Sequence, residues 1–404
     1  MVGTKGVARR DLQYVETLGL KWTPEQRDQY LDNVKVVDIT RLEEPYPVND
    51  YFTAGTPKAK KQWDAFWHNK PLCDRRNNKG KRRQILNLDT SRLQYIIKQD
   101  ESVMFRDADT KELVLVVLRD FVPDEDVRET MVGVGNEILK YRRDDRREDP
   151  GMLVHFGYTC GSRHAPQIQM ATPSVRLNSQ KNRDREKTLN VKAQGLAGVL
   201  WNMMKSRMPA EVIDAYNDMI DEHDLPRMDM MRDDGTFSFR IDGKAVTFRG
   251  LELPPPSAMS AINYARYTHK EHNGNNWVVA FTSSAPRSPA RGGNFYLASY
   301  GIMMEPATNT VSAWHPLDYH GTTLYEMAEE QGKIGKRHGH ALRLDGDMNT
   351  GIIFEVSRAM KNARLRSNWL DDRGKAVPAA KLIRRAERIS KQTRYGLRPP
   401  RLLL

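Results

Sequence analysis

Cysteine is scarce in this chain, and its scarcity excludes two kinds of architecture. Only Cys73 and Cys160 occur among 404 residues. Two thiols cannot supply the four ligands of a structural zinc module or a framework of several disulfides. This cysteine usage is typical of a protein in a reducing compartment.

Long apolar runs are missing as well. No stretch approaches the roughly 18 consecutive apolar residues that a membrane-spanning helix needs. Residues 1–5 do not begin an apolar signal region. The sequence therefore predicts no membrane association. The hydrophobic fraction of 39% is below the usual value for globular proteins but is enough for a core.

Positive charge is abundant and unevenly distributed. The formal net charge is +12, and residues 361–404 hold 13 Lys or Arg against 3 Asp or Glu, a balance of +10. The other 360 residues are therefore nearly neutral. Such a segment is typical of proteins that bind phosphate backbones, although a solvated tail has the same composition. We expect residues 361–404 to form a basic extension with a helix over about 377–395.

Residues 1–83 are expected to be a peripheral N-terminal segment. Trp63, Phe66 and Trp67 have helical spacing, which predicts that they pack inward. The basic run 75–83 is typical of a nuclear-import signal or a phosphate contact, and equally of a solvated loop. We expect nuclear localisation.

The next part of the chain, residues 84–360, is expected to form one domain with much β structure. Apolar runs at 103–105 and 113–118 flank a polar turn, which predicts a β-hairpin. Alternation over 236–252, interrupted by Asp242-Gly243, predicts a second hairpin.

Helices are expected on either side of these strands. Thr23 is a candidate N-cap for a helix over 24–33. Helical periodicity predicts a helix over 124–142 and further helices within 190–222. The charged residues 177–189 lack periodicity and predict a loop.

Groups that bind metal ions are concentrated at residues 268–276. His269 and Glu271 are two residues apart, so on an extended strand both side chains point to one side and can bind one ion. His320 lies far enough downstream for several short strands to intervene, and it is the third candidate ligand. Two histidines and a carboxylate form the facial triad of non-haem Fe(II) oxygenases, which leaves one face of the metal open.

Short β-strands are expected around these three residues. Strand-like segments occur at 264–267, 277–281, 294–297, 311–314 and 351–356. Residues 316–320 are then expected to form a turn that places His320 beside the other two candidate ligands.

This order and the motif resemble the TET/JBP branch of the Fe(II)/2-oxoglutarate dioxygenases, most of all its fungal members. The family pattern is His-Arg-Asp, then His-Asn-x-Asn-Asn, then an apolar strand. The chain reads His269-Lys270-Glu271, His272-Asn273-Gly274-Asn275-Asn276, Trp277-Val278-Val279. The resemblance extends over roughly residues 100–360. It implies an α+β protein with a double-stranded β-helix (jelly-roll or cupin-like) core flanked by helices.

The same resemblance implies a set of cofactors and site residues. Fe(II) is expected on His269, Glu271 and His320, with 2-oxoglutarate and dioxygen as co-substrates. Arg337 occupies the position of the arginine that binds 2-oxoglutarate, and Arg343 is the alternative. An arginine suits this role because its planar guanidinium pairs with a carboxylate bidentately.

The substrate implied is a methylated base in double-stranded DNA. The expected reaction oxidises 5-methylcytosine to 5-hydroxymethylcytosine and further, after the base has flipped out of the duplex. Asn273, whose amide both donates and accepts, is the candidate for reading the base edge. His272 and Tyr319 are candidate pocket walls. N6-Methyladenine is the alternative base within the family, and we expect a monomer.

One departure from the family pattern bears on activity. The family has Asp where this chain has Glu271, whose side chain is one methylene longer. A displacement of about 1 Å can reduce a rate about a hundredfold. A DNA-binding protein with weak or no turnover is therefore one alternative, and a hydroxylase of RNA or protein is another.

Two further interpretations involve other side chains. His315 and Asp318 could be a metal pair, but an offset of three residues places them on opposite faces of a strand. Arg163 follows a Gly-rich turn and could reach the carboxylate of the co-substrate, whereas a structural salt bridge is the alternative.

Overall fold

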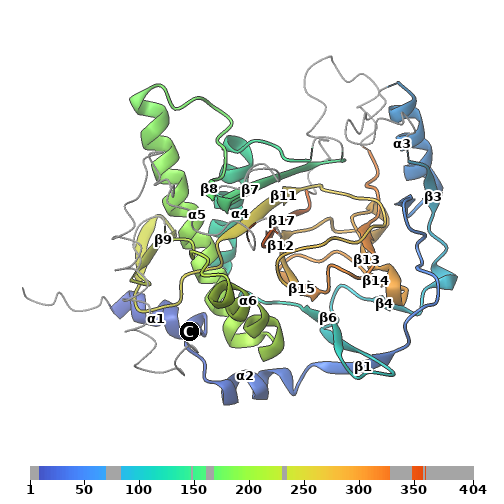
Figure 1. The fold of residues 1–404 in the computed structure, drawn as a ribbon, viewed down its shortest axis with the longest axis horizontal. Helices are drawn as coiled ribbons and strands as arrows, with labels where there is room; N and C mark the ends of the chain where they lie inside the picture. The colour runs from blue at the N-terminus through green and yellow to red at the C-terminus, as the bar shows by residue number, and fades with distance from the viewer. Residues whose placement is uncertain are drawn as a thin grey trace, which may run out of the picture.

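Two β-sheets face each other at the centre of the computed structural model (Figure 1), which describes residues 9–69, 83–146, 149–160, 168–229, 234–327, 348–357 and 360. The larger sheet has nine strands. In spatial order they are β1 (Lys35–Ile39), β5 (Val103–Asp107), β6 (Leu113–Leu118), β15 (Thr310–Trp314), β12 (Val278–Ser284), β17 (Thr350–Phe354), β11 (Ser257–Ile262), β7 (Met152–Thr159) and β8 (Gln169–Met170).

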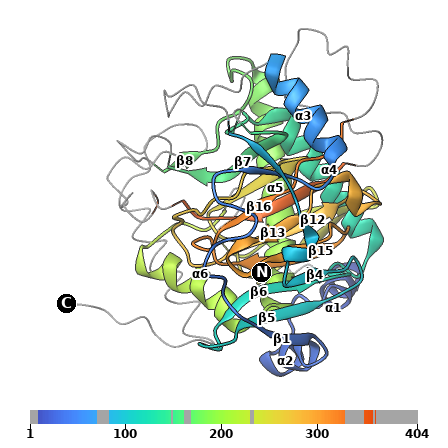
Figure 2. The ribbon, with the colours of Figure 1, turned by 90° about the vertical axis from the view of Figure 1, so that its right-hand side faces the viewer.

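The smaller sheet has four strands and lies on the side of the molecule that Figure 2 presents. Their order is β16 (His320–Thr322), β13 (Phe295–Leu297), β14 (Ile302–Met304) and β4 (Tyr95–Ile97). Two strand pairs stand apart from both sheets. They are β9 (Phe237–Ile241) with β10 (Lys244–Phe248), and β2 (Phe52–Ala54) with β3 (Ile85–Asn87).

The path of the chain between the sheets is that of a double-stranded β-helix. From β11 in the large sheet it crosses to residue 269, which bridges β16 of the small sheet. It then runs through β12 (large), β13 and β14 (small), β15 (large), β16 (small) and β17 (large). Repeated crossing between two facing sheets confirms the predicted α+β fold with this core.

Helices cover the outer face of the large sheet (Figure 1). The helical elements are α1 (Arg9–Thr17), α2 (Pro24–Leu31), α3 (Pro57–Asn69), α4 (Glu125–Tyr141), α5 (Gln180–Arg207), α6 (Ala210–Glu222), η1 (Thr90–Arg92), η2 (Pro289–Arg291) and η3 (Ala298–Tyr300). Helix α2 packs on α5, whereas α3 packs on the β2–β3 pair at the other side of the molecule (Figure 1). None of the helices in the described ranges is long and apolar enough to cross a membrane.

The apolar side chains of the large sheet alternate between two cores. One set, including Val279 and Phe354, packs against α4, α5 and α6. The other, including Phe105, Val278 and Trp314, faces the small sheet. This period of two is what a sheet buried on both faces requires.

Several sequence expectations are confirmed in detail. Both hairpins form, and Asp242 and Gly243 adopt φ of 45° and 67° in the turn between β9 and β10. Thr23 caps α2 in a capping box with Gln26. The expected strands at 277–281, 294–297, 311–314 and 351–356 correspond to β12, β13, β15 and β17.

Two expectations were wrong. Residues 180–189 are helical, because the hydroxyl of Ser179 accepts from the Asn182 amide and caps α5. The first turns of α5 project beyond the core, which is why they lack an apolar stripe. Residues 264–267 are not a strand but the crossover between the two sheets.

The N-terminal segment is more integrated than a peripheral one. Strand β1 forms the edge of the large sheet and pairs in parallel with β5. Trp63 and Trp67 of α3 are 1% and 2% exposed, as their spacing predicts. The basic extension 361–404 and most of the basic run 75–83 lie outside the described residues.

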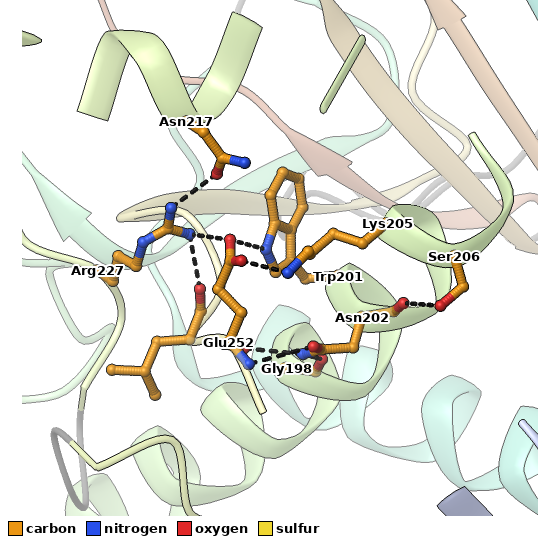
Figure 3. Close-up of polar contacts among 9 residues, drawn as sticks. Gly198, Trp201, Asn202, Lys205, Ser206, Asn217, Arg227 and Glu252 are labelled. Carbon is orange, nitrogen blue, oxygen red and sulfur yellow. Dashed lines mark hydrogen bonds and ion pairs between the residues drawn. The ribbon is translucent and has the colours of Figure 1, made fainter. Parts of the chain in front are cut away.

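A partly buried polar cluster holds the helices to the chain that enters β11 (Figure 3). The Glu252 carboxylate accepts from Trp201 Nε1 at 3.0 Å and pairs with Lys205 of α5. Arg227 Nη1 lies 2.7 Å from Glu252 Oε1, and its Nη2 donates to Asn217 of α6 at 2.7 Å. Burial opposes the charged form of Glu252, but the two cations outweigh it and hold its pKa below the usual value.

Candidate metal centre

The two candidate histidine ligands are direct neighbours across the small sheet. Asn263, with φ of 49°, ends β11, and the chain crosses over to His269. The His269 amide donates to the His320 carbonyl at 2.9 Å, and the His320 amide donates back at 2.8 Å. This antiparallel pair brings the imidazole centroids to 4.5 Å. His320 is the first residue of β16 and follows a turn at residues 316–318.

Each imidazole is oriented by a backbone carbonyl two residues earlier. His269 Nδ1 lies 2.8 Å from the Tyr267 oxygen, and His320 Nδ1 lies 2.8 Å from the Asp318 oxygen. A carbonyl oxygen can only accept, so both Nδ1 atoms donate. In its neutral form, each ring therefore carries its lone pair on Nε2, the arrangement that metal-binding histidines use.

The third candidate ligand, Glu271, is held at one oxygen. Its Oε1 accepts from Arg266 Nη1 at 3.1 Å and lies 3.5 Å from Arg146 Nη2. The same oxygen is 3.3 Å from His269 Nε2. The backbone amide of Glu271 donates to Pro316 at 2.8 Å, which fixes the stretch next to the turn that leads into β16.

These donors fit a single metal ion. The two imidazole nitrogens and the carboxylate oxygen all lie within 4.8 Å of one another. Ligands at about 2.0–2.2 Å from one ion must lie within about 4.4 Å of one another. Small side-chain rotations are enough to close this difference. Within the described part of the chain, no other group of three His, Cys, Asp or Glu meets this criterion.

Electrostatics favour the charged form of Glu271 and the neutral form of His320. Burial raises the pKa of Glu271, but the hydrogen bond and charge of His269, with Arg266 and Arg146, outweigh it, so the pKa lies well below its usual range. Burial, followed by the charge of His269, lowers the pKa of His320 to about 3. At neutral pH Glu271 is a carboxylate and His320 is neutral.

A cavity of about 160 Å³ opens from this cluster into the space between the two sheets. Apolar side chains form most of its wall: Leu153, Met259, Val278, Ala280, Phe295, Met304, Trp314 and Ile353. A few polar groups converge there as well, among them Tyr264, Ser312, Thr322 and Asn349. An apolar cavity with a few polar groups is the usual form of a small-molecule site.

Two polar groups of this wall are suited to contact a ligand. Trp314 is 7% exposed, and its Nε1 is buried without a hydrogen-bond partner among the described residues. Its ring lies 5.7 Å from that of His320. Glu355, just after β17, has its pKa raised to about 7, first by burial and then by the charge of Glu271. Both groups can hydrogen-bond a ligand in the cavity.

The predicted substrate residues are close in sequence to the candidate metal ligands. His272 is exposed, and Tyr319 packs against the core around Tyr296 while Lys270 Nζ lies 5.3 Å from its ring. Asn273 forms a bridge with Ser357, and its Nδ2 is buried without a partner in the described ranges. None of the three belongs to the described lining. A contact between these residues and a substrate stays a prediction.

The remaining candidate residues divide into two groups. Arg337, Arg343 and Arg163 lie outside the described residues. His315 hydrogen-bonds the carbonyl oxygens of Asn276 and Leu113, and Asp318 pairs with Arg41. Neither His315 nor Asp318 is a member of the metal-binding group.

Sequence reasoning missed Arg266, Arg146 and Glu355. Arg266 precedes His269 by only three residues, and this closeness to the metal motif could have indicated a role at the site. Arg146 lies in a charged stretch that resembles an ordinary surface loop, and only the tertiary fold brings it to Glu271.

Comparisons with known proteins give structural similarity only. No family model and no curated protein matches the chain. NgTET1 in complex with DNA containing 5-methylcytosine is similar at a TM-score of 0.38 and 11% identity, covering 66% of this chain and 83% of that one. A 2-oxoglutarate-Fe(II) oxygenase family protein from Burkholderia pseudomallei gives a TM-score of 0.28 and 11% identity, with coverages of 60% and 84%. A prolyl hydroxylase from Trichoplax adhaerens gives 0.28 and 6%, with coverages of 62% and 87%. Similarities of this extent do not assign a substrate.

Proposed function

We propose that the chain is an Fe(II)- and 2-oxoglutarate-dependent dioxygenase that oxidises the methyl group of a methylated DNA base. The observation that carries this proposal is the convergence of His269, Glu271 and His320 at a cavity inside a double-stranded β-helix. Two histidines and one carboxylate on one side of an ion leave the other side for co-substrate and dioxygen.

The residues of the chain have distinct roles in this proposal. The Nε2 atoms of His269 and His320 and the carboxylate of Glu271 would hold Fe(II), since the two Nδ1 atoms donate to backbone carbonyls and Arg266 fixes the carboxylate. Iron in such a site couples the oxidative decarboxylation of 2-oxoglutarate by dioxygen to the oxidation of a C–H bond. The apolar wall excludes water from the reacting groups, which limits side reactions.

The co-substrate and the base both require polar contacts in the cavity. We assign Trp314 Nε1 as a hydrogen-bond donor to a bound ligand, because it is buried beside His320 without a partner in the described structure. We further propose that Arg337, or in its place Arg343, binds the distal carboxylate of 2-oxoglutarate.

A nucleic acid substrate is supported by charge. The net charge is +12, and the exposed cations include Arg143, just after α4, and Lys181, in the first turn of α5. Arg142 pairs with Glu186 of α5, and Arg146 of the same short stretch reaches Glu271. Since the cavity lies inside the β core, a base in duplex DNA has to flip out to enter it, at a cost of a few kcal/mol.

We propose 5-methylcytosine as the base, oxidised to 5-hydroxymethylcytosine and further, by a monomer in the nucleus. Mass spectrometry of nucleosides tests this directly. The protein, loaded anaerobically with Fe(II), is incubated with 2-oxoglutarate, air and duplex DNA carrying 5-methylcytosine or N6-methyladenine. We expect 5-hydroxymethylcytosine, abolished in His269→Ala and retained in His223→Ala, which changes a histidine at the end of α6.

Other outcomes of this experiment separate the alternatives. Loss of the methyl group from N6-methyladenine alone would replace the proposed base with the other one. DNA binding without product on either duplex would contradict the enzyme proposal for DNA. Turnover on a methylated RNA or a peptide, with none on DNA, would identify a hydroxylase of a different substrate class.

A further inference from the structure

The orientation of His320 depends on the position of Asp318. The Asp318 carbonyl oxygen accepts from His320 Nδ1 at 2.8 Å, so a displacement of residue 318 turns the ring and moves its Nε2. Interactions of this kind, one shell outside a metal, set both the tautomer and the ring direction of a histidine ligand.

Asp318 is held in turn by a residue almost three hundred positions earlier. Its carboxylate pairs with Arg41 Nη2 at 2.5 Å. The side chain of Asp318 is only 7% exposed, whereas that of Arg41 is 51% exposed. A buried carboxylate without its cation is costly, so the turn before β16 is expected to move when Arg41 is removed.

Arg41 is itself fixed at a second point. Its Nη1 donates to the hydroxyl of Tyr300 at 3.1 Å, and that hydroxyl donates to Asp107 Oδ2 at 2.9 Å. Asp107 Oδ1 accepts from the amides of residues 109 and 110, each at 2.9 Å. The guanidinium thus contacts the turn before His320 directly and is linked to β5 of the large sheet through the Tyr300 hydroxyl.

Residues that follow Arg41 in the sequence hold the stretch before the other histidine, His269. Downstream of Arg41, the amide of Asp50 donates to the Thr268 carbonyl at 2.9 Å. The amide of Thr268 donates to the Tyr51 carbonyl at 3.0 Å. Thr268 directly precedes His269, so residues 40–51, here called the N-terminal arm, contact both sides of the metal cluster.

We propose that the N-terminal arm is a positioning element of the metal centre and that Arg41 is its principal positioning residue. Arg41 acts through Asp318 on the direction of the His320 ring, while the backbone of Asp50 and Tyr51 holds the stretch before His269. This inference rests on the proposed metal site, but it does not depend on the substrate.

Metal affinity tests the proposal without requiring turnover. Co(II) is titrated into the full-length protein by calorimetry, and the visible spectrum of the bound ion reports its ligand geometry. Loss of such an outer interaction typically weakens metal binding about 10- to 100-fold. We expect a loss in this range for Arg41→Ala, with an altered Co(II) spectrum.

The ion pair between Lys111 and Asp38 supplies a matched control. Lys111 Nζ pairs with Asp38 of β1 at 2.7 Å, and both side chains are at least half exposed. Lys111→Ala removes a surface ion pair without touching the turn of His320 and is expected to change Co(II) affinity less than twofold. Arg41→Lys restores the charge but not the two-point contact, so an intermediate affinity is expected.

Two results would overturn the inference. One is equal Co(II) affinity and an unchanged spectrum in Arg41→Ala and Lys111→Ala. If Arg41→Ala does not fold, Asp318→Asn is tested in its place. The second contradicting result is an unchanged Co(II) affinity in Asp318→Asn. Normal Co(II) binding by the wild type without oxidised nucleoside would overturn the proposed reaction while the effect of Arg41 still supported the inference. A wild type that binds no Co(II) would overturn both.

Discussion

Arg266 Nη1 donates a hydrogen bond to Glu271 Oε1 at 3.1 Å, and this contact occupies one oxygen of a candidate metal ligand. Arg146 lies 3.5 Å from the same oxygen. The same oxygen lies 3.3 Å from His269 Nε2. The two arginines therefore hold the carboxylate beside the imidazole nitrogen that is a candidate metal ligand.

Removing this contact should weaken metal binding. Arg266→Gln shortens the side chain and removes the charge, so Glu271 loses the donor that fixes its direction. We predict a loss of Fe(II) or Co(II) affinity of about 10- to 100-fold, measured by calorimetry. Arg128→Gln, which removes an arginine from the α4 surface, is the control. Equal affinities in the two variants would show that Arg266 has no role at the metal.

Replacing Glu271 by aspartate, the residue of the pattern that the sequence resembles, should not improve the site. Glu271→Asp withdraws the carboxylate by one carbon–carbon bond, about 1.5 Å, from Arg266. A displacement of about 1 Å can reduce a rate about a hundredfold, so we predict lower turnover and weaker metal binding in this variant. Higher turnover than the wild type would instead mean that the natural glutamate impairs the enzyme.

The buried N–H of Trp314 gives a prediction for ligand binding. Trp314→Phe keeps an aromatic ring in the cavity and removes only the donor. One neutral hydrogen bond contributes about 0.5–1.5 kcal/mol, so we predict that the dissociation constant of 2-oxoglutarate rises about 2- to 13-fold. Calorimetry on the metal-loaded protein measures this constant. Trp277→Phe is the comparison, because Trp277 stacks on His315 outside the cavity, and an equal effect of both changes would contradict the assignment.

The raised pKa of Glu355 predicts how the stability of the metal-free protein changes with pH. Burial, with the charge of Glu271, raises its pKa from 4.5 to about 7, against the opposing charges of His155, Arg146 and Arg266. Its contribution to stability is therefore fully present below about pH 4.5 and is lost as the pH rises through about 7. Each pKa unit corresponds to about 1.4 kcal/mol, so Glu355→Gln should gain up to about 3 kcal/mol on the wild type between pH 5 and pH 8.

Urea unfolding of both proteins at these two pH values measures the gain. A difference between the proteins that stays constant with pH would mean that Glu355 titrates normally.

The cluster around Glu252 should be important for stability. Glu252→Gln leaves Lys205 and Arg227 without their shared carboxylate in a largely buried site. Removing one partner of a buried pair typically costs about 3–5 kcal/mol, and we predict a loss of this size in urea unfolding. Glu211→Gln on the exposed face of α6 is the control. A loss no larger than that of the control would show that the cluster is dispensable.

Much of the fold was predictable because local patterns and tertiary structure agree. The alternation in β9 and β10, the cap at Thr23 and the spacing of His269 and Glu271 are all short-range signals. Each depends on a period or a turn that a few residues specify.

Other features could not be predicted because they depend on contacts between distant residues. The crossover at 264–267 contains aromatic residues typical of a strand, yet it connects two sheets and pairs with neither along its length. The pairing of Arg41 with Asp318 joins positions 277 residues apart. No local pattern indicates which surface arginine meets which buried carboxylate.

The most direct test of the proposed metal centre is to measure how many Fe(II) ions the protein binds with and without each of the three ligands. Fe(II) is titrated anaerobically into the wild type and into His269→Ala, Glu271→Ala and His320→Ala, and 2-oxoglutarate is then added while visible absorption is followed. We predict one tightly bound Fe(II) in the wild type, an absorption change on adding 2-oxoglutarate, and loss of both in all three variants. A wild type that binds no Fe(II), or a His320→Ala variant that binds it equally well, would contradict the proposed metal centre.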